Sequence, residues 1–180
     1  MDPIADLGLP SHITKDDCYT AQEDAAGCSI QAHNENTFGD GYNAAGGGFE
    51  VLLWTESEIT MWFFPRNAPL PPTLTSDHPD PSVFGKPLAR WTFARSGCDL
   101  PRRTQDLQIV FNIEMCGDWT NGAWGAQCAA ETGYSSCSDF VANNPKAFAN
   151  SYWKINSVKW FKDRFRLRRD GFGNETVIPV

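Results

Sequence analysis

The chain has 180 residues, of which 41% are hydrophobic, so it is long enough for one domain with a core. Its formal charge of −7 argues against nucleic acid as the main partner, and no stretch approaches the ~20 apolar residues of a membrane span. Aromatic residues are abundant at 13%, including seven Trp and 12 Phe, which suits a surface that stacks on ligands.

Strand signals begin after a turn-rich stretch over residues 1–45. The sequence FEVLLWTESEITMWFF predicts two strands, over 49–54 and 58–64, joined by a turn at 55–57. The proline-rich residues 67–90 are predicted to form a long loop, because proline cannot donate to a strand ladder.

The second half of the chain alternates between strand and loop signals. LQIVFNIEMC (107–116) places apolar side chains on one face and predicts a strand, whereas the Gly-, Asn- and Cys-rich residues 117–137 predict a loop. SDFVANNPKAF (138–148) predicts a short helix and YWKINSVKWF (152–161) a final strand. Short strands, long loops and one short helix favour an all-β sandwich.

The two ends of the chain carry separate signals. MDPIADLGLP lacks the basic and apolar regions of a secretory leader, so we expect either a fragment or a sequence begun too late. KWFKDRFRLRR (159–169) holds six of the 15 basic side chains. Such a run is usually a solvated strand edge or tail, and a binding role is the alternative. The sequon at Asn174 would fit glycosylation of a secreted protein.

The six cysteines suggest disulfides and an oxidising compartment. Six cysteines allow fifteen pairings, and short separations favour Cys18–Cys28, Cys128–Cys137 and Cys98–Cys116. A zinc site is not expected, since no CxxC occurs and the three His lie at no metal-ligand spacing. We therefore predict no metal site.

Carbohydrate binding is the function that composition favours, because no nucleophile elbow, P-loop or HExxH motif is present. In CGDWTNGAWG, Trp119 and Trp124 could stack on sugar rings while Asp118 and Asn121 bond hydroxyls. The equal alternative is that both Trp pack a loop against the sheet.

Paired carboxylates would be needed for retaining glycoside hydrolysis, ~5–5.5 Å apart. Glu56 and Glu58 have the spacing of one strand face, but their position at the predicted turn favours solvated side chains. Glu114 is a second, isolated candidate without an evident partner.

An ordered set of motifs resembles the C-terminal part of fungal family 16 glycoside hydrolases, the laminarinase-like endo-1,3(4)-β-glucanases. The motifs are AGCSI (26–30), GYNAAGGGFEV (41–51), ITMWFFPRN (59–67), FGKP (84–87), CDL (98–100), IVFNIEMCGDW (109–119) and CSDFVANNPKAFANSYWKINSVK (137–159).

This resemblance implies a concanavalin A-like jelly-roll sandwich whose cleft binds β-1,3(4)-glucan, in an extracellular protein without a cofactor. It covers about residues 18–160, leaving 1–17 as a poorly matched segment and 161–180 as a basic tail. The sandwich is expected to be incomplete, with N-terminal strands missing. It implies no membrane span and says nothing of oligomeric state.

The family's two catalytic glutamates lie on one strand in a Glu-x-Asp-x-x-Glu motif. None of the eight glutamates of this chain begins that motif. The chain is expected to start after that strand, and His12 cannot be given the role of a family histidine. No catalytic residue is assigned, and the chain as it stands is predicted to be inactive.

The resemblance places Trp119, Trp62 and Arg66 on the substrate-binding side of the cleft, with Trp124 and Asn121 as looser assignments. Alternation puts Trp62 and Phe63 on opposite faces of their strand. We expect Phe63 in the core, Trp62 facing the glucan and Arg66 at the rim after Pro65 ends the strand.

Three alternatives remain. The first is an active glucanase whose N-terminal half lies outside this sequence. The second is a non-catalytic β-glucan-binding or cell-wall protein. The third is a fragment that does not fold alone, since missing strands would expose sheet edges and core.

Overall fold

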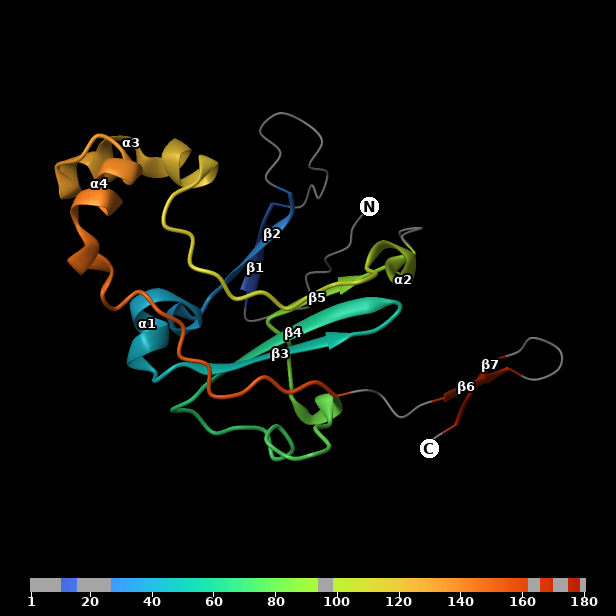
Figure 1. Cartoon of the computed structure of the whole chain (residues 1–180). Helices are drawn as coiled ribbons and strands as arrows, with labels where there is room; N and C mark the ends of the chain where they lie inside the picture. Colours follow the sequence, from blue (N-terminus) through green and yellow to red (C-terminus); the bar gives the residue numbers. More distant parts are fainter. Residues whose placement is uncertain (1–10, 16–26, 94–98, 162–165, 170–174, 179–180) are drawn as a thin grey trace. The chain divides into compact units, whose positions relative to one another are not determined.

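The structure is a computed structural model that describes residues 11–15, 27–93, 99–161, 166–169 and 175–178 (Figure 1). The chain divides into two compact units, one over Met1–Leu107 and the other over Gln108–Val180. None of the helices in the described ranges is long and apolar enough to cross a membrane.

A three-stranded antiparallel sheet forms the centre of the first unit. Strands β3 (Gly48–Trp54) and β4 (Glu58–Pro65) form a hairpin, and β5 (Ala89–Thr92) pairs with the other edge of β4. The hydroxyl of Thr55 accepts hydrogen bonds from the amides of Ser57 and Glu58, which fixes the turn. The prediction of two strands and a turn is confirmed here.

The proline-rich segment after β4 covers one face of this sheet and builds the core. Cross-strand pairing places Val51 opposite Trp62, so the two side chains share a face. The loop brings Leu74 and Phe84 onto that face, and with Trp62 they form the buried cluster of the unit. The predicted loop is confirmed, with a short 3₁₀ turn, η2 (Pro81–Val83), inside it.

The turn-rich N-terminal region contains elements that composition did not indicate. Strands β1 (Ser11–Lys15) and β2 (Ser29–Ala32) form an antiparallel hairpin. The 3₁₀ turn η1 (Glu35–Thr37) and the helix α1 (Gly39–Ala44) follow, and the short helix α2 (Leu100–Arg103) lies later in the unit.

A glycine is required where this region enters β3. A Cβ on Gly48 would lie 2.3 Å from the ring of Phe63, closer than any packed side chain can approach. The absence of a side chain therefore lets Phe63 pack across the start of β3.

The second unit contains a kinked helix, α3 (Asp118–Thr132), and the helix α4 (Cys137–Asn143), followed by the 3₁₀ turn η3 (Pro145–Phe148). The prediction of a loop over 117–137 is wrong. The run AQCAAET consists largely of strong helix formers, and Gly125 marks the kink inside α3.

The helix predicted over 138–148 is confirmed as α4 and η3, but its start is set earlier. The hydroxyl of Ser136 accepts a hydrogen bond from the amide of Asp139 and so caps α4. Farther along the chain, β6 (Arg166–Arg169) and β7 (Glu175–Ile178) form an antiparallel hairpin, so part of the basic run is a strand.

Residues 107–116 and 152–161 are extended but belong to no sheet, so the prediction of strands there is wrong for this chain. A strand needs a neighbour with which to exchange backbone hydrogen bonds, and neither segment is in a ladder with another described strand. The fold is therefore only partly all-β: its sheets are antiparallel, and helices α1–α4 accompany them.

Candidate functional site

Trp62 lies in the core rather than on an open surface. Its side chain is 6% exposed and packs edge-on against Phe84, with ring centroids 5.8 Å apart. Its indole Nε1 donates a hydrogen bond of 3.1 Å to the carbonyl of Gly85. Phe63, on the opposite face, is half-buried against Tyr42. The prediction that Trp62 faces the glucan and Phe63 the core is wrong, because the proline-rich loop covers the Trp62 face.

Arg66 is held in place directly after β4, which ends at Pro65 as predicted. Its Nε donates to the carbonyl of Gly46 at 3.0 Å, and its guanidinium lies 5.0 Å from the centre of the Phe49 ring. The side chain is nevertheless exposed, so its charged end can meet a ligand. A fixed, exposed guanidinium at the end of a sheet is a suitable donor for sugar hydroxyls.

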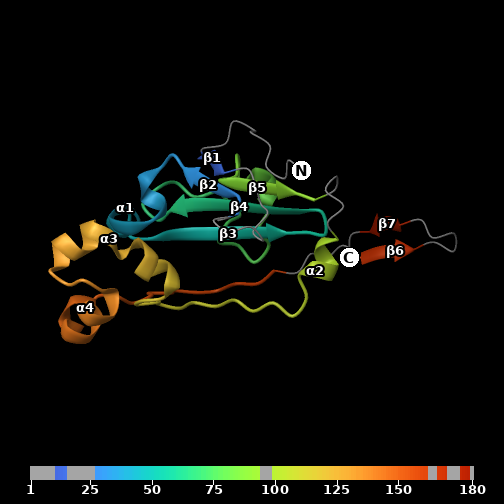
Figure 2. The ribbon, with the colours of Figure 1, turned by 90° about the horizontal axis from the view of Figure 1, so that it is seen from above.

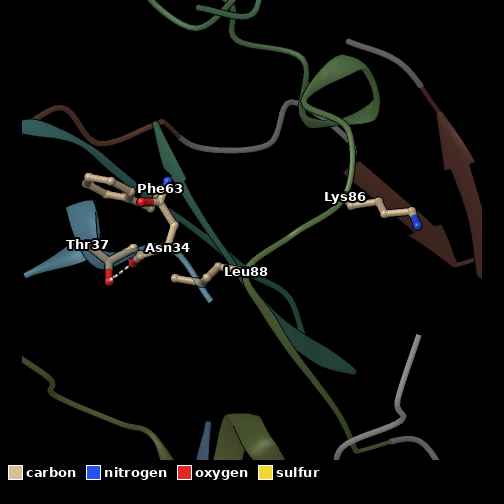
Figure 3. A pocket seen from close by; sticks show the side chains of 5 residues that line it. All are labelled: Asn34, Thr37, Phe63, Lys86 and Leu88. Atoms are coloured by element: carbon tan, nitrogen blue, oxygen red, sulfur yellow. Dashed lines mark hydrogen bonds between the residues drawn. The ribbon is translucent and has the colours of Figure 1, made fainter. Parts of the chain in front are cut away.

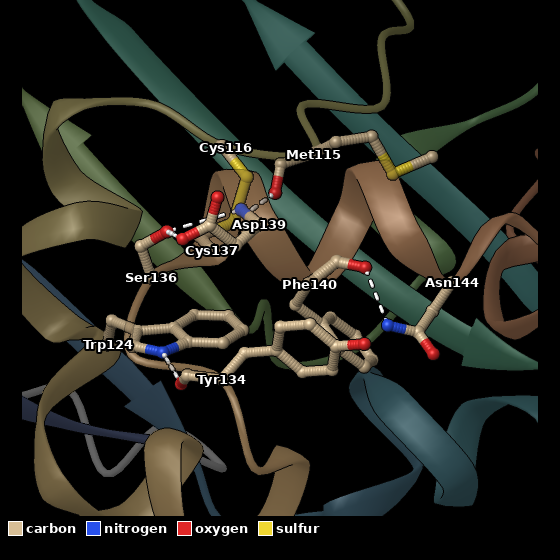
Figure 4. The surroundings of a disulfide bond; sticks show 9 residues. All are labelled: Met115, Cys116, Trp124, Tyr134, Ser136, Cys137, Asp139, Phe140 and Asn144. Carbon is tan, nitrogen blue, oxygen red and sulfur yellow. Dashed lines mark hydrogen bonds between the residues drawn. A yellow bond between two sulfur atoms is a disulfide. The ribbon is translucent and has the colours of Figure 1, made fainter.

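Trp124 of α3 packs against Phe140 of α4 in the second unit (Figure 4). Its Nε1 donates to the carbonyl of Tyr134 at 3.0 Å, and its ring lies 5.9 Å from that of Phe140. Phe140 also contacts the rings of Tyr134 and Phe148. This half-buried cluster fastens α3 to α4 and η3, which favours a packing role for Trp124 over stacking on a sugar.

The other two predicted binding residues lie at the start of α3. Asn121 is exposed, and its backbone N–H donates a hydrogen bond to the carbonyl of Gly117. The side chain of Trp119 lies outside the described part of the structure, as do Asn174 and residues 1–10. Binding roles for Trp119, Asn121 and Arg66 therefore stay predictions.

Cys116 and Cys137 form a disulfide that closes a sequence separation of 21 residues (Figure 4). The predicted pairs Cys128–Cys137 and Cys98–Cys116 are wrong. The spacing argument assumed a loop between Cys128 and Cys137, whereas Cys128 lies within α3 and keeps a free, half-buried thiol. Cys28 is also disulfide-bonded, and Cys18 and Cys98 lie outside the described residues.

Among the candidate carboxylates, Glu58 is held in an ion pair across the sheet. Glu58 lies in β4 and is bound by Arg90 of β5, whose Nε donates to Glu58 Oε2 at 3.0 Å. The hydroxyl of Thr60 donates to Glu58 Oε1 at 3.4 Å. Glu56 is exposed in the turn, and Glu114 is exposed in the second unit. Glu58 thus contributes to the pairing of β4 with β5 through its ion pair with Arg90.

We expect Glu58→Gln to lower the free energy of unfolding by about 0.5–1 kcal/mol, because the cross-strand ion pair is partly exposed. Urea denaturation of the purified chain measures this loss. Glu56→Gln is the matched control and should change stability by less than about 0.5 kcal/mol. Equal losses in the two variants would contradict the role given to the ion pair.

A small pocket in the first unit does not provide a ligand site (Figure 3). Asn34, Thr37, Phe63, Lys86 and Leu88 line it, and Lys86 points away from the other four. Its volume of about 80 Å³ is far below the ~300–1,000 Å³ of ligand pockets. The described residues also contain no group of three or more His, Cys, Asp or Glu placed to hold a metal ion.

Comparisons with known proteins identify the family. Residues 5–161 match the catalytic domain described as XgeA-like of glycoside hydrolase family 16. A probable endo-1,3(4)-β-glucanase of Aspergillus clavatus is 36% identical over 158 residues, covering 86% of this chain and 24% of the relative.

Two solved structures are similar. The laminarinase 16A of Phanerochaete chrysosporium, described with β-glucans in its donor and acceptor sites, is 33% identical with a TM-score of 0.61. The match covers 81% of this chain and 48% of that one. An elongating family 16 β-1,3-glucosyltransferase is 30% identical with a TM-score of 0.70, covering 84% of this chain and 51% of that one.

The chain thus spans about a quarter of the curated relative and about half of each solved relative. The match nevertheless extends over most of the chain itself and includes the motifs quoted above. The chain belongs to glycoside hydrolase family 16.

Proposed function

We propose that this chain is the acceptor-side, β-glucan-binding part of an extracellular endo-1,3(4)-β-glucanase, and that the 180 residues alone do not hydrolyse glucan. The observation that carries the proposal is the absence of Glu-x-Asp-x-x-Glu from a chain of this family. Retaining hydrolysis needs a nucleophile and an acid/base carboxyl on either side of the scissile bond. Of the candidate carboxyls, Glu58 is ion-paired with Arg90, and Glu56 and Glu114 are exposed.

The proposed substrate class, β-glucan, is supported by what the relatives share. The names of the three relatives describe β-1,3(4)-glucan or β-1,3-glucan chemistry, and one solved relative holds β-glucans. Hydrolysis and glucosyl transfer differ in what accepts the sugar, so binding of a β-1,3-linked chain is the property common to them. We propose that Trp119 of the second unit stacks on a sugar ring and that Arg66 of the first unit binds sugar hydroxyls.

We expect Trp119→Ala to raise the Kd of the chain for laminarin about 3- to 10-fold, because an aromatic contact contributes about 0.5–1.5 kcal/mol. Affinity electrophoresis in laminarin gels and titration calorimetry measure the change. Trp54→Ala is the matched control, since Trp54 is an exposed Trp in β3 to which no binding role is given, and it should leave Kd unchanged. If the unmutated chain did not bind laminarin, the proposal would be wrong.

A non-catalytic β-glucan-binding or cell-wall protein is the second candidate, and the missing catalytic motif favours it as well. The two candidates differ in whether added strands turn binding into hydrolysis. Retention on insoluble β-glucan without hydrolysis, even when the half of the family domain that this chain does not match is supplied, would support the second.

A further inference from the structure

Two histidines of the first unit, His12 and His33, lie against each other on the hairpin of β1 and β2. Their rings stack with centroids 5.3 Å apart and an interplanar angle of 20°. His12 pairs with Gln31 across the hairpin, and His33 follows two positions after Gln31, so the two histidines share one side of the strands. Their distance along the chain does not indicate this pair, because strand pairing brings the rings together.

The backbone beside each histidine is fixed. Ser11, directly before His12, is buried, and its hydroxyl donates a hydrogen bond of 2.5 Å to the carbonyl of Leu88. Asn34, directly after His33, caps η1, because its side chain accepts a hydrogen bond of 2.9 Å from a backbone N–H of that turn. Figure 2 shows β1 and β2 side by side in the first unit. The two imidazoles are therefore held near each other before any ligand binds.

The ring nitrogens of this pair are accessible. Both side chains are exposed. Among the described residues, none forms a hydrogen bond or an ion pair with either imidazole ring, and the contact of the two rings with each other is their one interaction. A neutral imidazole has one nitrogen with a lone pair, so each ring can offer a ligand atom to a cation from solvent.

The separation of the rings fits two ligands of one metal ion. A ring that binds a metal through a nitrogen at ~2.0–2.1 Å has its centre ~3.2 Å from the metal, so two such rings at a tetrahedral angle have centres ~5.2 Å apart. The observed 5.3 Å agrees with this value. The rings are nearly parallel, so binding requires each to turn a nitrogen toward a common point. Rotation about χ2, whose energy profile is broad for His, allows this in an exposed side chain.

We propose that His12 and His33 form a surface site for a divalent transition-metal cation of the zinc and nickel class. Imidazole nitrogen suits Zn²⁺, Ni²⁺ and Cu²⁺, whereas Mg²⁺ and Ca²⁺ prefer oxygen ligands. Two protein ligands leave the other coordination positions to water, so the ion is exchangeable. A bound ion joins β1 to the chain that follows β2 and stabilises the folded hairpin by mass action. This inference does not depend on the proposed function.

The test titrates the 180-residue chain, without a polyhistidine tag, with NiCl₂ by calorimetry and repeats the titration with ZnCl₂. We expect one ion per chain, and we expect His12→Gln and His33→Gln each to weaken Ni²⁺ binding by about 10-fold or more, because each removes one of two linked ligands. His78→Gln is the matched control, since His78 is exposed in the proline-rich loop and outside the pair, and it should leave the affinity unchanged.

A second control addresses the thiol of Cys128, the other side chain with affinity for these ions. Cys128→Ser should bind Ni²⁺ like the unmutated chain, and loss of binding in this variant would overturn the histidine site. Absence of Ni²⁺ binding, or equal weakening by His78→Gln, would show that His12 and His33 only stack and would overturn it too.

Circular dichroism of each variant checks that it is folded. If one histidine variant failed to fold, the other would decide the outcome, since the loss of either ring breaks the pair of ligands. Laminarin binding is measured separately in buffer with a chelator. Failure of the metal site and failure of the proposed function are thereby distinguished.

Discussion

We expect Trp62→Ala to lower the free energy of unfolding of the chain by about 3–5 kcal/mol, the range for truncating a large buried aromatic side chain. Trp62 is 6% exposed and lies between the sheet and the loop that carries Leu74 and Phe84. Its removal leaves a cavity and frees the carbonyl of Gly85 from its indole donor. Urea denaturation followed by circular dichroism measures the loss.

Two controls separate packing from a general loss of Trp. Trp62→Phe keeps most of the ring contact and removes the hydrogen bond, so it should cost clearly less than Trp62→Ala. Trp54→Ala removes a Trp that is 41% exposed and should cost less than about 1 kcal/mol. If Trp62→Ala cost no more than Trp54→Ala, the proline-rich loop would not cover this face in solution.

Replacing both Cys116 and Cys137 with Ser should lower the free energy of unfolding by about 3 kcal/mol. The estimate follows from the chain entropy that a cross-link over 21 residues removes from the unfolded state. The same change should raise hydrogen exchange in α4 and in residues 108–115, because the disulfide joins them. Chemical denaturation and exchange mass spectrometry measure the two effects.

Cys128→Ser is the control for this pair, since Cys128 carries a free thiol in α3. It should change stability by less than about 1 kcal/mol, and peptide mapping without reductant should recover Cys116 linked to Cys137. A mapped bridge between Cys128 and Cys137 would contradict the structure.

The hairpin of β3 and β4 could be predicted from the sequence because its signals are local. Alternation fixes which side chains share a face, and Thr55 forms the turn within a few residues of both strands. The prediction of which face of β4 is buried is wrong, because burial of a face depends on where the proline-rich loop lies. Composition alone does not place a loop, so the sequence does not show that Leu74 and Phe84 cover Trp62.

Cysteine pairing and α3 were missed for a related reason. The Gly- and Asn-rich start of residues 117–137 indicated a loop, and the pairing by short separation depended on it. The helix-forming run after Gly125 was the signal that could have corrected both predictions. Residues 107–116 show the limit of pattern alone: alternation indicates a strand, but a ladder also needs a neighbour.

Laminarin hydrolysis by the purified 180-residue chain tests the central claim most directly. We expect binding of laminarin with no reducing sugar released above a mock purification, because the sequence contains no Glu-x-Asp-x-x-Glu motif to supply the two carboxyls of a retaining glycosidase. Release of oligosaccharides that co-purifies with the chain and is absent from the mock preparation would contradict it.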